Sequence, residues 1–233
     1  MTTAIILAGG LGTRLRAAVP DLPKPLAPVA GRPFLEHQID YWARQGVDDI
    51  ILSVGYRADL IQAHFGQRYR GLPVRYVIET EPLGTGGGLL LAAAQLHDSA
   101  PFLLLNGDTY FAVNLARLQA FHCEHQSDWT FSLFRAREEG RYMRTPLAAD
   151  GRILGFSADK GAIGDLANGG VYVIDPSALQ RIATQFKGNF SIEADLLPAL
   201  LAEGGRVFGL ECGGDFIDIG VPDDYFRAAS LIA

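Results

Sequence analysis

A short apolar run near the N-terminus ends abruptly in glycine, and this junction limits the fold more than any other part of the chain. The run, Ala4–Leu7, leads almost directly into Gly9, Gly10 and Gly12. A continuous apolar run of this length is typical of a strand buried on both faces in a parallel sheet. Glycine after such a strand lets backbone N–H groups approach an anion closely, because no Cβ intervenes. The junction therefore predicts an α/β fold with an anion-binding turn at the end of the strand.

Two cations follow the glycine turn and strengthen this interpretation. Arg14 offers a planar fork that suits phosphate oxygens, and Lys24 stands between Pro23 and Pro25, which fix the backbone on either side. A strand, a glycine turn and two cations together predict a triphosphate site, although the glycines alone are also consistent with a plain tight turn. The turn lacks the Gly-Lys-Ser/Thr of a P-loop, and Leu15 stands where a dinucleotide-binding fingerprint needs its third glycine.

Strand and helix patterns alternate along the first half of the chain. The predicted strands are Asp49–Val54, Val74–Ile78 and Phe102–Leu105, and the predicted helices are Pro33–Gln45, Ala58–Phe65 and Thr85–Leu96. Alternation of this kind predicts a parallel sheet with helices on both faces. Ligands of such sheets bind at the carboxyl ends of the strands. We therefore expect the loops at Gly9, Glu79 and Asn106 to converge on one crevice.

The second half of the chain is richer in strand patterns. The predicted strands are Trp129–Phe134, Arg152–Phe156, Val171–Ile174, Val207–Leu210 and Phe216–Ile219, and the predicted helices are Ile192–Ala202 and Pro222–Leu231. We expect this half to extend the same sheet and to add a substrate-binding region. The chain of 233 residues is then a single domain, 1–233.

Composition and charge restrict the partners. The formal net charge of −6 argues against nucleic acid, since nucleic-acid-binding domains usually carry a basic stripe. No apolar run approaches the roughly 20 residues of a membrane helix, and no signal peptide is recognisable, so we expect no membrane association. The two cysteines, Cys123 and Cys212, lie far apart in the sequence, which favours a reduced, cytoplasmic protein.

Two aspartates at strand ends are candidate metal ligands. Asp108 follows the buried strand Phe102–Leu105, and Asp218 lies in the strand Phe216–Ile219. A triphosphate reaction needs a divalent ion to neutralise phosphate charge, and Mg²⁺ is often held by one or two carboxylates together with the phosphates. Asp108 is equally consistent with an aspartate that caps a turn.

The whole string Leu-Ala-Gly-Gly-Leu-Gly-Thr-Arg-Leu at 7–15, with Pro-Lys-Pro at 23–25, resembles the signature of the sugar-1-phosphate nucleotidyltransferases. The resemblance extends over essentially the whole chain. It implies a Rossmann-like nucleotidyltransferase fold, with a mixed, mostly parallel central sheet flanked by helices. It also implies transfer of a nucleoside monophosphate from an NTP to a sugar 1-phosphate. Residues of about 1–110 would form the nucleotide-binding half, and residues of about 111–233 the sugar-phosphate-binding half.

The resemblance also implies roles for individual residues. The expected catalytic residues are Arg14, Lys24 and Asp108, and Asp108 and Asp218 are expected to hold Mg²⁺ together. The expected nucleotide-binding residues are Leu7, Ala8, Gly9, Gly10, Gly12, Thr13, Glu79, Glu81, Gly84, Thr85 and Gly107. The expected sugar-phosphate-binding residues are Tyr142, Lys160, Asn168, Gly169, Gly170 and Glu193.

The sugar side departs from the family pattern at two points. The usual Glu-Lys-Pro around the phosphate-binding lysine is Asp159-Lys160-Gly161 in this chain, and Met143 stands where a glycine commonly follows the tyrosine at Tyr142. Glu193, which matches the family's sugar-contacting glutamate, is also consistent with a residue that serves a helix dipole.

The loop at 79–88 is expected to face the base. Glu79 and Glu81 are good acceptors for the N1–H and N2–H donors of guanine, whereas uracil has one N–H between two carbonyls that a carboxylate would repel. The alternative is that both glutamates face solvent and that backbone groups at 83–85 read the base. The motifs most resemble the guanylyltransferase branch that acts on D-glycero-D-manno-heptose 1-phosphate. A uridylyltransferase for N-acetylmuramic acid 1-phosphate, a catalytically silent nucleotide-sugar-binding regulator and a homo-oligomeric assembly remain open alternatives.

Overall fold

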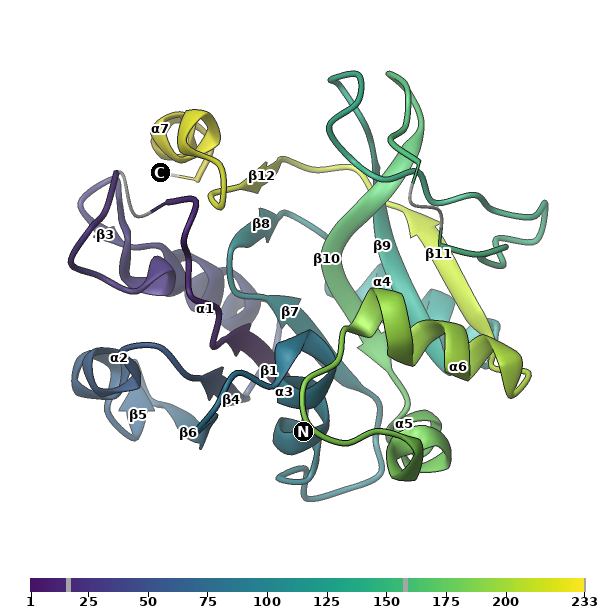
Figure 1. Ribbon diagram of the computed structural model, residues 1–233, viewed down its shortest axis with the longest axis horizontal. Coiled ribbons are helices and arrows are strands. Elements are labelled where there is room, and N and C mark those ends of the chain that lie inside the picture. The colour runs from purple at the N-terminus through teal and green to yellow at the C-terminus, as the bar shows by residue number, and fades with distance from the viewer. Residues whose placement is uncertain (16–17, 157–158, 233) are drawn as a thin grey trace.

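The computed structural model describes residues 1–15, 18–156 and 159–232, and one sheet runs through the middle of the molecule (Figure 1). Its strand order is β11-β9-β10-β7-β1-β4-β6-β5, so both halves of the chain contribute to it. The strands are β1 (Thr3–Ala8), β4 (Asp49–Val54), β5 (Arg68–Tyr69), β6 (Leu72–Ile78), β7 (Phe102–Asn106), β9 (Trp129–Arg135), β10 (Leu166–Ile174) and β11 (Val207–Glu211). The prediction that the second half extends the sheet of the first is confirmed.

The sheet is mixed and mostly parallel, as expected. Strands β1, β4, β6 and β7 run parallel to one another, and β11 runs parallel to β9. Strand β10 is antiparallel to both of its neighbours, β7 and β9, and β5 is antiparallel to β6 at the edge. The central strands are mostly apolar because both faces of the sheet are covered. Alternate residues of β1 show this, since Ala4 and Ile6 belong to one buried cluster and Ile5 to another.

Helices cover both faces of the sheet. Helices α1 (Phe34–Arg44), α2 (Ala58–Phe65) and α4 (Leu115–Glu124) share the cluster of Ala4 and Ile6. Helices α3 (Gly84–Ala93), α5 (Pro176–Ile182) and α6 (Leu197–Ala202) share the cluster of Ile5. A short 3₁₀-helix at Ala183–Gln185 follows α5, and a π-helical turn at Ile192–Leu196 leads into α6. The result is the three-layer arrangement predicted from strand and helix alternation.

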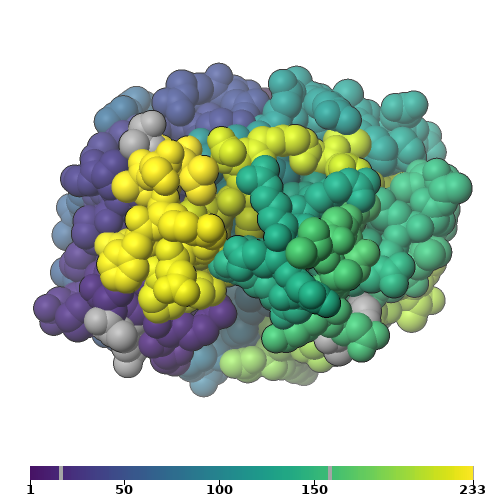
Figure 2. Space-filling model, turned by 90° about the horizontal axis from the view of Figure 1, so that it is seen from above, coloured from purple at the N-terminus to yellow at the C-terminus, as the bar shows by residue number. Residues whose placement is uncertain are grey.

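A small layer closes the molecule above the carboxyl ends of the central strands. It contains β8 (Thr109–Phe111) paired antiparallel with β12 (Phe216–Asp218), the hairpin of β2 (Pro28–Val29) and β3 (Arg32–Pro33), a 3₁₀-helix at Lys24–Leu26, and helix α7 (Pro222–Ile232). Figure 2 shows the C-terminal segment (yellow) lying against the N-terminal segment (purple). A third apolar cluster joins them, in which Leu15 and Val19 belong together with Ile217 and Ala228. The C-terminus thereby becomes part of the wall around the strand ends.

Most predicted elements are confirmed within a few residues, and one is wrong. The predicted strand Arg152–Phe156 is absent from the described residues there, 152–156, which make only isolated bridges, such as Arg152 with Phe208. The positive φ of Gly151 turns the chain immediately before this stretch, and Ile153 donates one N–H to the Val207 carbonyl at the edge of β11. The prediction did not include α5 or the short strand β8.

Candidate active site

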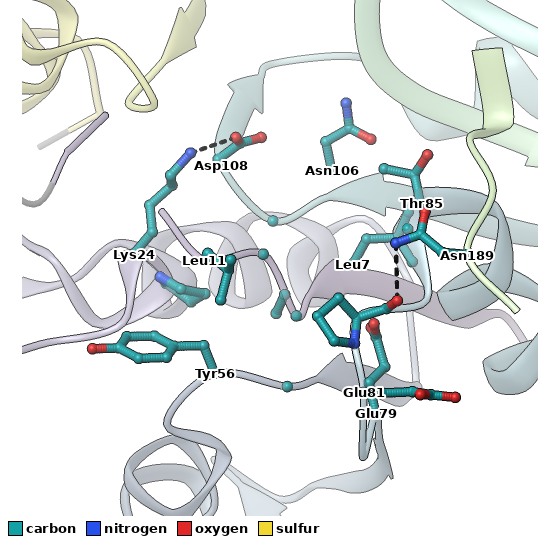
Figure 3. A pocket seen from close by; sticks show the side chains of 18 of the residues that line it. Leu7, Leu11, Lys24, Tyr56, Glu79, Glu81, Thr85, Asn106, Asp108 and Asn189 are labelled. Carbon is teal, nitrogen blue, oxygen red and sulfur yellow. Dashed lines mark hydrogen bonds and ion pairs between the residues drawn. The ribbon is translucent and has the colours of Figure 1, made fainter. Parts of the chain in front are cut away.

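A cavity of about 580 Å³ opens at the carboxyl ends of β1, β4, β6 and β7 (Figure 3). Gly9 follows β1, Gly55 follows β4, Glu79 follows β6 and Asn106 ends β7, and all four line the cavity. The prediction that the loops at Gly9, Glu79 and Asn106 meet at one crevice is confirmed. The cavity has a charged end, lined by Lys24 and Asp108 with Arg14 and Asp218 close by, and a loop end, formed by residues 79–85 and Asn189.

An ion pair between Lys24 and Asp108 marks the charged end. Lys24 Nζ donates a hydrogen bond to Asp108 Oδ2 at 2.8 Å, and the two side chains are 12% and 32% exposed. Lys24 begins the 3₁₀-helix directly after Pro23, and Pro25 follows, so its backbone has little freedom. The carboxylate is open enough for other ligands, and an anion that enters the cavity competes with it for Lys24 Nζ.

Strand β12 brings Asp218 next to this pair. The Ile219 N–H donates to the backbone oxygen of Asp108 at 2.9 Å, which joins the two aspartate-bearing segments. Burial raises the pKa of the Asp218 carboxyl above its usual value, and the negative charge of Asp108 raises this pKa further. The positive charges of Lys24 and Arg14 act in the opposite direction. The carboxylate of Asp108 is therefore close enough for its charge to act on that of Asp218.

Gly220 lies where the charged side chains converge. A Cβ at this position would lie 2.7 Å from Asp218 Oδ1, 2.9 Å from Lys24 Nζ and 3.3 Å from Arg14 Nη2. The Gly220 N–H donates to Asp218 Oδ1 at 2.7 Å. A side chain at position 220 would shift the ends of these flexible charged side chains. Arg14, which the sequence predicts as a catalytic cation, therefore belongs to the same cluster as Asp218.

The glycines of the N-terminal turn serve different purposes. A Cβ on Gly9 would lie 2.4 Å from Glu79 Oε1, whereas a Cβ on Gly10 would meet nothing within 4 Å. Gly12 has a φ of +59°, in the left-handed region that glycine adopts without strain. Gly10 leaves its backbone open to the cavity, as an anion-binding turn requires, while Gly9 makes room for a carboxylate.

Glu79 is firmly held at the loop end. Ser53 Oγ donates to Glu79 Oε1 at 2.9 Å, and the Leu83 N–H donates to Glu79 Oε2 at 3.2 Å. A Cβ on Gly88 would approach Oε1 to 2.9 Å, so the carboxylate lies close to α3 as well. Glu81 is exposed and makes no hydrogen bond or ion pair with the described residues. The two glutamates that the sequence treats alike are therefore different in the structure.

A segment from the second half of the chain closes over the loop end. Its residues 189–192 pack against residues 82–86, and a Cβ on Gly84 would lie 2.4 Å from the Phe190 carbonyl oxygen. Four hydrogen bonds join the two segments: Asn189 Nδ2 to Pro82 O (2.9 Å), the Phe190 N–H to Leu83 O (3.0 Å), the Gly86 N–H to Phe190 O (3.0 Å) and the Ile192 N–H to Thr85 Oγ1 (2.9 Å). The loop that carries Glu79 is thus held from both sides.

The predicted sugar side includes an irregularity of strand β10 at residues 168–170, which packs against β7 and β8. Asn168 Nδ2 donates to the buried Tyr172 hydroxyl at 2.7 Å, and the Gly170 N–H donates to Asn168 Oδ1 at 3.0 Å. Gly170 has a φ of +73°, and a Cβ there would lie 2.4 Å from Thr109 Oγ1. Burial raises the pKa of Tyr172, and the negative charge of Glu193 raises it further. Asn168 and Glu193 are therefore both close to Tyr172, next to the turn that carries Asp108.

Tyr142 and Lys160 lie on a separate flap, residues 136–165 without 157–158. Tyr142 packs against Phe134 and Phe216, with ring centroids 5.0 and 5.7 Å away, and burial raises its pKa to about 12. Lys160 is exposed and forms an isolated bridge with Met143. The flap is joined to α7 by ion pairs of Arg141 with Asp224 and of Glu138 with Arg227.

Part of the predicted set lines the cavity together with residues that the sequence did not indicate. The predicted residues that line it are Leu7, Ala8, Gly9, Gly10, Lys24, Glu79, Glu81, Gly84, Thr85, Gly107 and Asp108. Among the described residues, the lining does not include Gly12, Thr13, Arg14, Asp218, Tyr142, Lys160, Asn168, Gly169, Gly170 or Glu193. Asn106, whose loop was expected at the crevice, also lines it, and the lining residues that were missed are Leu11, Pro25, Gly55, Tyr56, Thr80, Pro82 and Asn189.

Local signals would have found most of the missed residues. Gly55 and Tyr56 follow a predicted strand, so the rule that ligands bind at strand ends applies to them as well. Asn189 has no such signal, because its contact with Pro82 is more than 100 residues distant in sequence.

The described part of the chain has neither a cluster of metal-binding side chains nor a membrane-spanning helix. No group of three or more His, Cys, Asp or Glu side chains there is arranged to hold a metal ion. No helix within residues 1–15, 18–156 and 159–232 is long and apolar enough to cross a membrane. Asp108 and Asp218 nevertheless bring two carboxylates together at the charged end, and carboxylate oxygens are donors that hard divalent cations accept.

Comparisons with known proteins place this geometry in context. The family described as "Nucleotidyl transferase" matches residues 3–233. The chain is 40% identical over 227 residues to D-glycero-alpha-D-manno-heptose 1-phosphate guanylyltransferase of Aneurinibacillus thermoaerophilus, covering 97% of this chain and 96% of that protein. It is 35% identical over 226 residues to the Campylobacter jejuni protein of the same name, covering 96% and 97%. The crystal structure of HddC from Yersinia pseudotuberculosis complexed with GMP-PN has a TM-score of 0.85 and 32% identity, covering 99% of each chain.

Proposed function

The chain belongs to the nucleotidyl transferase family, and from this premise we propose that it transfers GMP from GTP to D-glycero-α-D-manno-heptose 1-phosphate. The products are GDP-heptose, a precursor for surface polysaccharide, and pyrophosphate. The observation that carries the proposal is one cavity with Lys24 and Asp108 at its charged end and a fixed carboxylate, Glu79, at its loop end. The 40% identity over 97% of the chain to a heptose 1-phosphate guanylyltransferase supports the choice of sugar.

The chemistry is a direct displacement at phosphorus. An oxygen of the sugar 1-phosphate attacks the α-phosphorus of GTP, the new P–O bond forms, and the bond to the β-phosphate oxygen breaks. The attacking oxygen is already anionic, so the step needs no protein nucleophile and no general base. Catalysis then consists of holding the reactants in line and stabilising the charge that develops.

The charged end supplies this stabilisation. Lys24 Nζ, which now faces Asp108 at 2.8 Å, would donate to the phosphates, and Arg14 would add its planar fork. The open backbone at Gly10 would donate N–H groups to the same phosphates. Asp108 and Asp218 would hold Mg²⁺, because oxygen donors from two neighbouring carboxylates fit this hard cation. When bound, the ion would neutralise charge on the α-phosphate and the leaving pyrophosphate.

The loop end supplies base selectivity. Glu79 is the better candidate for the guanine contact because both of its oxygens are fixed by protein donors, at 2.9 and 3.2 Å. A carboxylate has about four lone-pair sites, so two donors leave room for guanine N1–H and N2–H. Glu81 is exposed and unrestrained, and we assign it no direct role.

The second half of the chain would bind the sugar phosphate. Asn168 and Glu193 are close to Tyr172, beside the turn that carries Asp108, and this supports a role for both in binding a sugar whose phosphate is at the charged end. Gly169 and Gly170 would let the sugar approach the turn. Tyr142 and Lys160 lie on the flap and would contact the sugar phosphate only if the flap lies over the charged end. We further propose that the enzyme acts in the cytoplasm.

A substrate panel tests the proposal. Purified protein with Mg²⁺ is given GTP, ATP, UTP or dTTP, each with heptose, mannose, glucose or N-acetylmuramic acid 1-phosphate, and pyrophosphate release is measured. We expect the highest kcat/KM for GTP with heptose 1-phosphate. Faster turnover of UTP with N-acetylmuramic acid 1-phosphate would replace the proposal with the uridylyltransferase alternative. No pyrophosphate from any pair would favour a catalytically silent regulator.

A further inference from the structure

Gln38 is a buried amide on α1 that the sequence did not single out. It is 2% exposed, and its amide nitrogen faces the loop between β7 and β8. Nε2 donates to the backbone oxygen of Asn106 at 2.9 Å and to that of Thr109 at 2.5 Å. These two carbonyl groups stand at the start and the end of the four-residue turn whose third residue is Asp108.

The turn is also held from its other side. The Gly107 N–H donates to the Leu7 carbonyl oxygen at 2.9 Å, and a Cβ on Gly107 would lie 2.3 Å from that oxygen. With residues 106, 107 and 109 all tied, the backbone of Asp108 has little freedom to move. Its carboxylate then changes position mainly by side-chain rotation.

The chemistry of the contact admits few other side chains at position 38. Carbonyl oxygens only accept hydrogen bonds, so both contacts require the amide nitrogen with its two hydrogens. Glutamate has the same shape but no donor, and methionine has similar length but no hydrogen-bonding capacity towards a carbonyl. Glutamine is the one uncharged side chain of this length that donates twice from a single atom.

The oxygen of the same amide is an unpaired acceptor in the core. Gln38 Oε1 is buried and has no hydrogen-bond donor among the residues that the structure describes. A buried acceptor without a partner lowers stability, and such groups in native structures call for a specific reason. The reason here is the pair of bonds made by the other end of the amide.

We infer that Gln38 is a positioning residue, which fixes the Asn106–Thr109 turn so that Asp108 is held next to Asp218 for a divalent cation. The inference rests on the proposed role of Asp108 as a metal ligand. Gln38 does not touch substrate or metal. Groups that orient metal ligands in this way typically contribute about 10- to 100-fold to metal affinity or activity.

The chain contains a matched control on the same helix. Gln45 caps the C-terminus of α1, donates from Nε2 to Val113 O at 2.7 Å and accepts from the Leu115 N–H at 3.0 Å. It therefore makes the same kind of bond to the backbone beyond β8, away from Asp108. A loss of packing or of a hydrogen bond affects both positions, whereas a loss of Asp108 positioning affects only position 38.

The test compares Gln38→Met with Gln45→Met by Mn²⁺ binding, measured by electron paramagnetic resonance with a non-hydrolysable GTP analogue present. We expect Gln38→Met to weaken Mn²⁺ binding about tenfold or more and Gln45→Met to change it less than about twofold. In turnover assays, Gln38→Met should raise the Mg²⁺ concentration for half-maximal rate. Equal Mn²⁺ affinities for the two folded variants would overturn the inference.

A second variant separates a loss of Asp108 positioning from a loss of folding. Gln38→Asn keeps an amide but is one methylene shorter, so it reaches at most one of the two carbonyls and should weaken Mn²⁺ binding by an intermediate factor. If neither variant at position 38 folds, Gln38 serves the fold itself and the inference is wrong. If Asp108→Asn binds Mn²⁺ as tightly as the wild type does, the proposed metal site itself is wrong. This outcome is distinct from a failure of the inference about Gln38.

Discussion

The two ends of the cavity are stabilised in opposite ways. At the loop end, Glu79 has a protein donor on each oxygen, and Gly9 and Gly88 pack closely against it. At the charged end, Lys24 and Asp108 form an ion pair with each other, and the nearby charge of Asp108 helps to raise the pKa of Asp218. The loop end is complete without a ligand, while the charged end has partners that a ligand must rearrange. The first arrangement suits recognition of a rigid base, and the second suits a reaction in which charge moves.

The two ends also depend on different parts of the chain. The loop end is built on β4 and β6, which are neighbours in the sheet, and is closed by residues 189–192. The charged end needs β12, which reaches Asp108 from more than 100 residues away in sequence. A substitution at one end should therefore leave the properties of the other end intact. The following predictions test this independence.

The largest effect is expected for Asp108→Asn. The change is nearly isosteric, so the fold should survive, but turnover should fall about 10²-fold or more because a ligand for transition-state charge stabilisation is lost. Pyrophosphate release at saturating Mg²⁺ measures the effect, and the control is Asp98→Asn, at an exposed aspartate whose Oδ1 accepts the Ala100 N–H. The preference for GTP over inosine triphosphate should not change. Near wild-type turnover would remove Asp108 from the metal site.

A smaller loss is expected for Lys24→Ala. Removal of one charge-assisted hydrogen bond costs about 1.5–3 kcal/mol, which corresponds to about one to two powers of ten in kcat/KM. The melting temperature should change little, since the partner Asp108 remains 32% exposed and can be solvated. Steady-state kinetics and thermal unfolding measure the two quantities. A variant that is unstable but fully active when folded would show that Lys24 is structural.

The comparison also explains which parts of the molecule are predictable from sequence. Strand β4 (Asp49–Val54) and helix α2 (Ala58–Phe65) have the predicted bounds, because apolar periodicity is a local property. The predicted strand Arg152–Phe156 is wrong because its pairing is limited to a few bridges, including one at the edge of β11, which local sequence does not reveal. Helix α5 was missed although Asp175 caps it and Pro176 begins it, a signal that the sequence does contain.

The site follows the same rule. Lys24 and Asp108 are found by motif, and the structure brings them to 2.8 Å. Asn189 and Gln38 act on backbone groups 107 and 68 to 71 residues away, so no local pattern identifies them. The difference between Glu79 and Glu81 is likewise invisible in sequence, because it depends on Ser53 from a neighbouring strand. Residues that hold other residues in place are the ones that sequence reasoning misses.

At the loop end, Glu79→Gln should reduce base selectivity. If Glu79 accepts from guanine N1–H and N2–H, the wild type should use inosine triphosphate poorly, because it lacks the N2 amino group. The amide is a weaker acceptor and adds an opposing donor, so the gap in kcat/KM between GTP and inosine triphosphate should narrow by about tenfold, near 1.4 kcal/mol. Glu81→Gln is the control and should leave the ratio unchanged. An unchanged ratio in both variants would assign base reading to backbone groups around 83–85.

The smallest effect is a change in stability, and it separates the two ends most directly. Burial and the charge of Asp108 raise the pKa of Asp218 in the folded state, despite the opposing charges of Lys24 and Arg14. The folded protein therefore holds this proton at a higher pH than the unfolded chain, in which an aspartate titrates near pH 3.9. Stability falls as pH rises from there through the raised pKa, and above it the ionised Asp218 destabilises the fold by a constant amount.

Asp218→Asn removes this cost and should raise the melting temperature at pH 7.5 without divalent metal, by about 1–3 °C for a chain of this size. The asparagine carbonyl can still accept the Gly220 N–H, and the gain should shrink as the pH falls through the raised pKa of Asp218. The exposed Asp215→Asn, three residues away, should show neither change. With Mg²⁺ and a GTP analogue the order should reverse, because only the wild type gains the full binding energy. A lower melting temperature at pH 7.5 for Asp218→Asn would mean that the charged end is already relaxed without a ligand, and the contrast between the two ends would fail.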